Sequence, residues 1–236
     1  MQAYFVDQSA NPLIATSGVL VIAGGGHVDL ALLKTLKNTG ATVIAADGGA
    51  DACAKADIVP AAIIGDLDSL ERRTEWERKT RVIEIKEQQT TDFEKCLYST
   101  KAALTLGLGL TGKRLDHTLN ALDVMLRYSK KRRIVLVDET DLALLRNGAF
   151  SFQVAPGERV SIHPLEKVAF ARSKGLKFAL DGLELAPGKR SGTSNRAVNG
   201  RFSVEPGPNE QGGWLLLLDK HYLGSLVSVL ADQPID

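Results

Sequence analysis

Short apolar runs alternate with longer helix-like segments through the first 146 residues, and this alternation limits the possible folds more than any other feature. Strands are expected at residues 19–23, 42–45, 61–64, 82–85, 106–110 and 134–137, and helices at about 30–39, 92–104 and 115–128. The apolar runs have no polar face, which is typical of parallel strands covered by helices. The sequence therefore predicts an α/β domain with a parallel sheet, and ligands bind such sheets at their carboxyl edge.

The pattern changes after Asn147. Short β-like runs follow at residues 150–154, 159–162, 176–180, 201–204 and 214–218. They are separated by turn-forming pairs such as Pro156-Gly157 and Asn199-Gly200, with no helical pattern between them. We therefore expect a small antiparallel β-sandwich domain at residues 147–236, after an α/β domain at residues 1–146.

Composition excludes several classes of protein. Hydrophobic residues make up 44% and charged residues 24% of the chain, which excludes a disordered or low-complexity protein. The formal charge of +1 provides no overall field for nucleic acid or an anionic membrane, so neither is an expected partner. Cys53 and Cys96 form no metal-binding pair. There is no apolar run of membrane-spanning length, and residues 1–11 lack the pattern of a secretion signal, so we expect a cytoplasmic protein.

Five aspartates follow the expected strands of the first domain, namely Asp47, Asp66, Asp68, Asp92 and Asp116. Carboxyl ends of parallel strands share one edge, so these like charges would repel one another unless a cation lies among them. Mg²⁺ takes oxygen ligands and is commonly shared with substrate phosphates. Each aspartate could instead cap the helix that follows it, but five at one edge, two of them in a D-x-D pair, favour a metal site.

Residues 107–114 are rich in glycine and end in Lys113-Arg114. The stretch fits neither a P-loop, which requires Ser or Thr where Arg114 stands, nor a dinucleotide-binding turn. Glycines still allow backbone N–H groups to approach an anion, and the two basic side chains would neutralise phosphate. A simple tight turn with two solvated bases is the alternative. His117 could hydrogen-bond phosphate, or could cap or pack.

The motifs together, in this order, resemble the thiamine pyrophosphokinase (thiamine diphosphokinase) family. The matching stretches are residues 46–50, 64–69, 88–95, 109–117, 160–165, 174–177 and 192–195. The resemblance implies a homodimer of chains with an α/β nucleotide-binding domain and a β-sandwich. It also implies Mg²⁺-dependent transfer of a diphosphate from ATP to the hydroxyl group of thiamine, which gives thiamine diphosphate and AMP.

The resemblance also implies roles for individual residues. ATP contacts are expected from Asp47, Gly48, Gly49, Lys95, Gly109, Gly112, Lys113, Arg114 and His117. Thiamine contacts are expected from Gln88, Thr91, Ser194 and Asn195. The metal ligands would be the five aspartates, and the catalytic set would be Asp66, Asp68, Asp92, Arg114 and Asp116. Either Asp92 or Asp116 would accept the hydroxyl proton.

Three positions depart from the family pattern. Lys113 stands where glycine is frequent, Ala121 where the family tends to have asparagine, and Arg196 where an acidic residue is frequent. Asn120 is offset by one residue, about 100° around a helix, so it does not simply inherit that role.

The alternative functions are a Mg²⁺-dependent nucleotide diphosphohydrolase and a non-catalytic nucleotide or thiamine sensor.

Overall fold

A computed structural model describes residues 12–231. The chain divides into two compact units on either side of the Ala121–Leu122 bond. The functional domain boundary expected at residues 146/147 is a different division and stays a prediction. The expectation for residues 1–11 lies outside the described residues. In the part of the chain that is described, no helix has both the length and the apolar character needed to cross a membrane.

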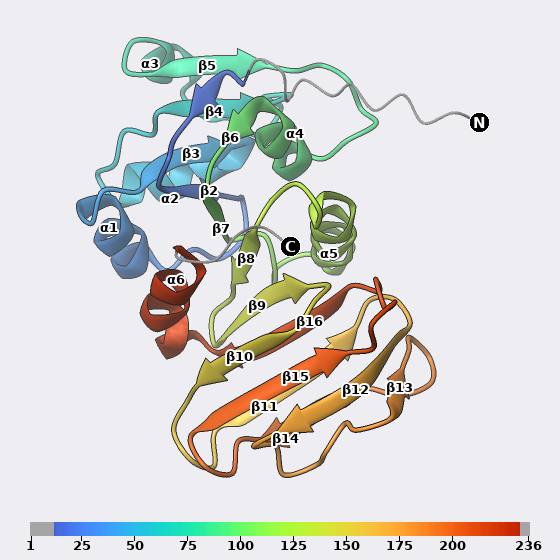
Figure 1. Ribbon diagram of the computed structural model, residues 1–236. Helices are drawn as coiled ribbons and strands as arrows, with labels where there is room; N and C mark the ends of the chain where they lie inside the picture. Colours follow the sequence, from blue (N-terminus) through green and yellow to red (C-terminus); the bar gives the residue numbers. More distant parts are fainter. Residues whose placement is uncertain (1–11, 232–236) are drawn as a thin grey trace. The chain divides into compact units, whose positions relative to one another are not determined.

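The first unit contains a sheet of five strands in the order β7-β2-β3-β4-β5, and every neighbouring pair is parallel (Figure 1). The strands are β2 (Val19–Ala23), β3 (Thr42–Ala46), β4 (Ala62–Gly65), β5 (Arg81–Glu84) and β7 (Leu104–Leu108). Side chains on both faces of the central strands are buried, which explains the continuous apolar runs in the sequence. The expected α/β class is thereby confirmed.

Helices connect or follow these strands. They are α1 (Leu30–Asn38), α2 (Ala50–Lys55), α3 (Arg73–Glu77), α4 (Asp92–Ser99) and α5 (Leu115–Tyr128), which runs across the unit boundary. The α1 helix begins where the Asp29 side chain accepts a hydrogen bond from the Leu32 N–H, at 3.0 Å. The α4 helix packs against β3 and β4, so its first residues lie beside the ends of these two strands. A two-stranded pair, β1 (Ile14–Ala15) and β6 (Thr100–Lys101), completes the unit.

The second unit is built mainly from antiparallel strands (Figure 1). One sheet contains β14 (Gly192–Arg196), β11 (Arg159–Pro164), β16 (Trp214–Asp219), β9 (Asp141–Arg146) and β8 (Ile134–Val137), in that order. The other contains β10 (Phe150–Gln153), β15 (Arg201–Pro206), β12 (Val168–Lys174) and β13 (Leu183–Leu185). The rings of Phe170 and Trp214, one from each sheet, meet edge to face at 5.6 Å. Helix α6 (Leu223–Ala231) follows the last strand.

Three expected elements differ from the structure. The helix expected at residues 92–104 ends at Ser99, because Thr100 turns to an extended conformation and pairs with Ile14 as β6. The strand expected at 106–110 ends at Leu108, since Gly109 has a positive φ of 68°. Residues 176–180 form a loop rather than a strand, apart from one isolated bridge at Leu176. Helices α2, α3 and α6 and strands β1, β6, β9, β12, β13 and β14 were not predicted.

Candidate active site

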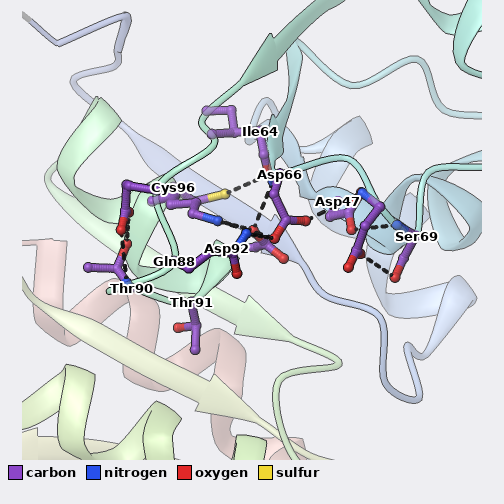
Figure 2. A network of polar contacts seen from close by, with 12 residues as sticks. Asp47, Ile64, Asp66, Ser69, Gln88, Thr90, Thr91, Asp92 and Cys96 are labelled. Atoms are coloured by element: carbon purple, nitrogen blue, oxygen red, sulfur yellow. Dashed lines mark hydrogen bonds and ion pairs between the residues drawn. The ribbon is translucent and has the colours of Figure 1, made fainter.

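Four of the five predicted aspartates come together at the carboxyl edge of the first-unit sheet, and Figure 2 shows three of them, Asp47, Asp66 and Asp92. Asp47 directly follows β3, Asp66 and Asp68 follow β4, and Asp92 is the first residue of α4. Carboxylate oxygens of Asp47, Asp66 and Asp68 lie within 4.8 Å of one another. Three acidic groups at this spacing offer oxygen ligands to a single divalent cation.

Asp47 is the most constrained member of this group. It has a positive φ of 44° and is only 3% exposed. Its Oδ2 accepts a hydrogen bond from the Ser69 N–H at 3.0 Å, whereas its Oδ1 is buried without a partner. The pKa of Asp47 is raised to about 6, mainly by burial and to a lesser extent by the nearby charges of Asp92 and Asp68. A buried carboxylate oxygen without a partner suits a cation ligand, so the donor set fits Mg²⁺.

Asp66 has the opposite environment. Its Oδ2 accepts a hydrogen bond from Gln88 Nε2 at 2.9 Å, and its Oδ1 accepts one from the Asp68 N–H at 3.3 Å. The Gln88 hydrogen bond is the largest of the effects that lower the pKa of Asp66. Asp66 is therefore held in its ionised form, ready to bind a cation. The side chain of Gln88, an expected thiamine contact, orients this carboxylate.

Gln88 lies in a short segment that is folded around Glu87. The carboxylate of Glu87 accepts hydrogen bonds from the Gln89 N–H at 2.7 Å, from the Thr90 N–H at 3.1 Å and from Tyr98 Oη at 3.1 Å. The Thr90 hydroxyl donates a further bond to it. This local network fixes the backbone on both sides of Gln88 and so directs its amide to Asp66.

Asp92 and Lys95 form an ion pair at the start of α4. The Lys95 Nζ lies 3.1 Å from Asp92 Oδ1 and 3.7 Å from Asp66 Oδ2. Asp92 Oδ1 also accepts a hydrogen bond from the Asp66 N–H at 3.2 Å. Asp92 therefore contacts Asp66, but it is not part of the three-carboxylate group formed by Asp47, Asp66 and Asp68.

A cavity of about 380 Å³ opens beside these carboxylates, entirely within the first unit. Asp92 lines it, as do seven of the residues expected to contact ATP or thiamine: Asp47, Gly48, Thr91, Gly109, Lys113, Arg114 and His117. Gly24 and Gly26 pack closely against Gly109. A Cβ added at either position would lie only 2.6 Å from the Gly109 carbonyl oxygen. The volume is in the range of small-molecule sites, and the polar lining contains both acidic and basic groups.

Arg114 and Asp116 make a separate exposed pair. The Arg114 guanidinium donates two hydrogen bonds to the Asp116 carboxylate, at 3.2 and 2.6 Å. The guanidinium lowers the pKa of Asp116, which is exposed. Asp116, an expected metal ligand, lies outside the three-carboxylate group in the described structure. Its contact with Arg114 orients the guanidinium, which lines the cavity.

Sequence reasoning missed several lining residues. Gly24, Asp51 and Ser69 line the cavity, as does Asn120, whose Oδ1 accepts a hydrogen bond from Thr91 Oγ1 at 2.9 Å. The hydrogen bond from Thr91 holds Asn120 at the cavity. Asn120 does so although the family tends to have its asparagine one residue later, where this chain has Ala121. The only sequence signal for the role of Asn120 was that it is an asparagine next to Ala121, the position where the family tends to have asparagine.

The remaining expected thiamine contacts belong to the second unit. Ser194 is on β14 with a positive φ of 59°, and its N–H donates to Ser161 Oγ at 3.0 Å. The buried side chain of Asn195 accepts a hydrogen bond from the Phe178 N–H and donates one to the Phe178 carbonyl, at 3.0 and 2.6 Å. Arg196 donates a hydrogen bond to the Gly157 carbonyl at 3.1 Å. The Asn195 amide therefore stabilises the loop that contains Phe178.

Comparison with known proteins gives matching results at the sequence and fold levels. Residues 33–137 match the family model described as thiamin pyrophosphokinase, catalytic domain. Thiamine pyrophosphokinase 1 of Arabidopsis thaliana is 30% identical over 164 residues, which are 62% of this chain and 61% of that protein. Thiamine pyrophosphokinase 2 of the same plant is 29% identical over 165 residues, with the same coverage of both chains.

A solved structure adds the fold. Thiamin pyrophosphokinase from Candida albicans superposes with a TM-score of 0.73 at 16% identity, over 86% of this chain and 89% of that chain. The comparisons indicate the thiamine pyrophosphokinase family. The family resemblance stated from the sequence is thereby confirmed. The chain spans about 61% of the length of the plant thiamine pyrophosphokinases that it matches.

The match to the thiamine pyrophosphokinase catalytic-domain model covers the whole carboxylate cluster and the Arg114–Asp116 pair, since all lie between residues 33 and 137. A first prediction concerns Asp47 within this cluster. Without a cation, its raised pKa makes the ionised carboxylate a cost to the folded state. This cost is absent well below the unfolded pKa of 3.8, grows as the pH rises from there to the folded pKa of about 6, and is complete above that value.

We therefore expect Asp47→Asn to raise the free energy of unfolding of the cation-free protein by about 1 to 3 kcal/mol at pH 8. Near pH 4 the same substitution should have little effect on it. Asparagine also tolerates the positive φ of this position, so backbone strain does not offset the gain. Urea unfolding in EDTA at both pH values measures the difference, and a variant no more stable than the wild type at pH 8 would contradict the buried, uncompensated charge.

Proposed function

We propose that the protein is a thiamine diphosphokinase, which transfers a diphosphate group from ATP to the hydroxyl of thiamine and releases AMP. The observation that supports this most directly is the group of three carboxylates with the buried, unpartnered Asp47 Oδ1, beside a cavity lined by Lys113 and Arg114. Acidic ligands for a cation next to basic side chains for phosphate are what phosphoryl transfer requires. The match to proteins named thiamine pyrophosphokinase supports thiamine as the acceptor in this proposal.

In this proposal Asp47, Asp66 and Asp68 hold Mg²⁺. When bound, Mg²⁺ would offset the negative charge of the triphosphate and so favour nucleophilic attack. Arg114, fixed by Asp116, and Lys113 bind phosphate oxygens, because an oriented guanidinium makes paired hydrogen bonds to phosphate. Gly48 and Gly109 line the cavity without side chains and leave room for the nucleotide.

Asp92 is the better supported acceptor of the hydroxyl proton. It lines the cavity, whereas Asp116 is not among the described lining residues and is engaged with Arg114. Thr91, next to Asp92, presents its hydroxyl beside Asn120 at the same cavity. A general base has to lie within hydrogen-bond reach of the reacting group, and Asp92 satisfies this requirement more readily.

The functions that the sequence analysis assigned to the two domains are also part of the proposal. Residues 1–146 would bind ATP and Mg²⁺, and residues 147–236 would form a β-sandwich that takes part in thiamine binding and in a homodimer. The two antiparallel sheets and the Phe170–Trp214 contact support the sandwich. Ser194 supports thiamine binding better than Asn195, whose amide is already engaged with Phe178. Homodimerisation and a cytoplasmic location remain predictions.

The test is to incubate the purified protein with Mg-ATP, with and without thiamine, and to measure AMP and thiamine diphosphate. We expect both products in equal amounts and only when thiamine is present. AMP release without thiamine would instead indicate a nucleotide diphosphohydrolase. Saturable ligand binding with neither product would indicate a sensor.

A further inference from the structure

The burial of Lys95 distinguishes it from the other basic residues near the cavity. Its side chain is 1% exposed, whereas Lys113 and Arg114 are exposed and line the cavity. A buried ammonium group is costly unless it is paired with opposite charge. Lys95 meets this condition through Asp92 and Asp66, and it is absent from the described lining of the cavity.

Lys95 also determines how Asp92 is used. Asp92 Oδ1 accepts hydrogen bonds from the Lys95 Nζ at 3.1 Å and from the Asp66 N–H at 3.2 Å. An oxygen that accepts two hydrogen bonds is poorly available to a cation. Asp47 Oδ1, in contrast, is buried without a partner. Lys95 therefore balances charge at the Asp92 side of the cluster, whereas no positive charge in the described part of the chain lies against Asp47 Oδ1.

We propose that Lys95 is a positioning residue, a built-in counter-cation that occupies one carboxylate oxygen of Asp92 and leaves room for a single divalent cation. The inference rests on the cation site of the proposed function. Four carboxylates gather here, and Lys95 supplies one positive charge among them. A lysine so placed replaces a second cation and holds the carboxylates together before any ligand arrives.

The resemblance gave Lys95 a different role, that of a phosphate contact. The two roles make opposite predictions for cation binding in the absence of nucleotide. A phosphate-binding lysine outside the cluster should have little effect on it. A counter-cation within the cluster competes electrostatically with the metal, so its removal should strengthen cation binding or allow a second cation to bind.

The experiment is titration of the nucleotide-free protein with Mn²⁺, followed by electron paramagnetic resonance of the unbound ion. We expect one Mn²⁺ per wild-type chain. Lys95→Met preserves the length of the side chain without its charge, and we expect it to bind the first Mn²⁺ on the order of tenfold more tightly, or to bind two. Unchanged affinity together with unchanged stoichiometry would overturn the proposal.

Lys113→Met is the matched control, since Lys113 is exposed and lines the cavity. It should leave the Mn²⁺ titration unchanged and weaken the binding of a fluorescent ATP analogue. If Lys95→Met does not fold by circular dichroism, Lys95→Gln, which retains a neutral donor, should show the same tightening. The wild type is itself a test, because two Mn²⁺ per chain would overturn the single-cation proposal.

The outcomes separate this inference from the proposed function. A wild-type protein that binds no Mn²⁺ would remove the cation site and the role of Lys95 with it. A protein that binds one Mn²⁺, with tighter binding in Lys95→Met, would support the role of Lys95 even if thiamine-dependent transfer were absent. Loss of transfer alone would overturn only the assigned reaction.

Discussion

Asp66→Asn should reduce thiamine-dependent AMP release by at least about a hundredfold while leaving the fold intact. Asp66 is the cluster member that is held ionised, because Gln88 and Lys95 both lie against its Oδ2. Asparagine has nearly the same shape but provides no negative charge for a cation. The loss should appear in kcat, since positioning and charge neutralisation act mainly in the transition state.

Asp57→Asn is a suitable control for this substitution. Asp57 is exposed and has a positive φ of 53°, a conformation that asparagine adopts as readily as aspartate. It makes the same change of charge outside the cluster, so turnover should stay within about twofold of the wild type. Near-normal turnover by a folded Asp66→Asn would exclude this carboxylate as a metal ligand. Far-ultraviolet circular dichroism at 25 °C checks that both variants are folded.

The position of the cluster could be predicted because it follows from topology. Residues 19–23 are apolar throughout, and residues 42–45 are apolar after Thr42. Both runs were expected as buried parallel strands, and the structure has them as β2 and β3. Once such strands are parallel, residues directly after them meet at one edge. The meeting of Asp47 with Asp66 and Asp68 therefore required no knowledge of side-chain conformation.

The partners of individual side chains could not be predicted in the same way. Gln88 and Lys95 were assigned to substrates, but their amide and ammonium groups face Asp66. Asp116 was expected beside the other aspartates, but it pairs with Arg114 two residues away. Loop conformation and rotamers decide these contacts, and neither has a period that a sequence pattern reveals.

The second half of the chain shows a similar limit. Residues 176–180 have an apolar, β-like composition, yet Phe178 bonds to the side chain of Asn195 instead of to a neighbouring strand. A side chain that supplies both a donor and an acceptor to the backbone can replace strand pairing. Asn195 is far from this loop in sequence, so composition alone predicted a strand where the tertiary contact stabilises a loop.

Gly65→Ala should strongly reduce thiamine-dependent AMP release even though the change adds a single methyl group outside the ligand set. Gly65 is the last residue of β4, and a Cβ there would lie 2.8 Å from Asp47 Cβ and 3.1 Å from Asp92 Oδ1. Its φ is not positive, so alanine is excluded by lack of space and not by backbone conformation. The methyl group would push apart the two carboxylates that flank Asp66.

We expect turnover to fall about a hundredfold, because small displacements of catalytic groups have effects of this size. The free energy of unfolding should also fall by about 1 to 3 kcal/mol, as is usual when a methyl group is forced into a filled space. Steady-state kinetics and urea unfolding measure the two effects on the same preparation. Gly18→Ala is the control, since a Cβ there meets nothing closer than Thr16 Oγ1 at 3.8 Å. If Gly65→Ala keeps both its activity and its stability, the cluster tolerates displacement, and its close spacing is not what the chemistry depends on.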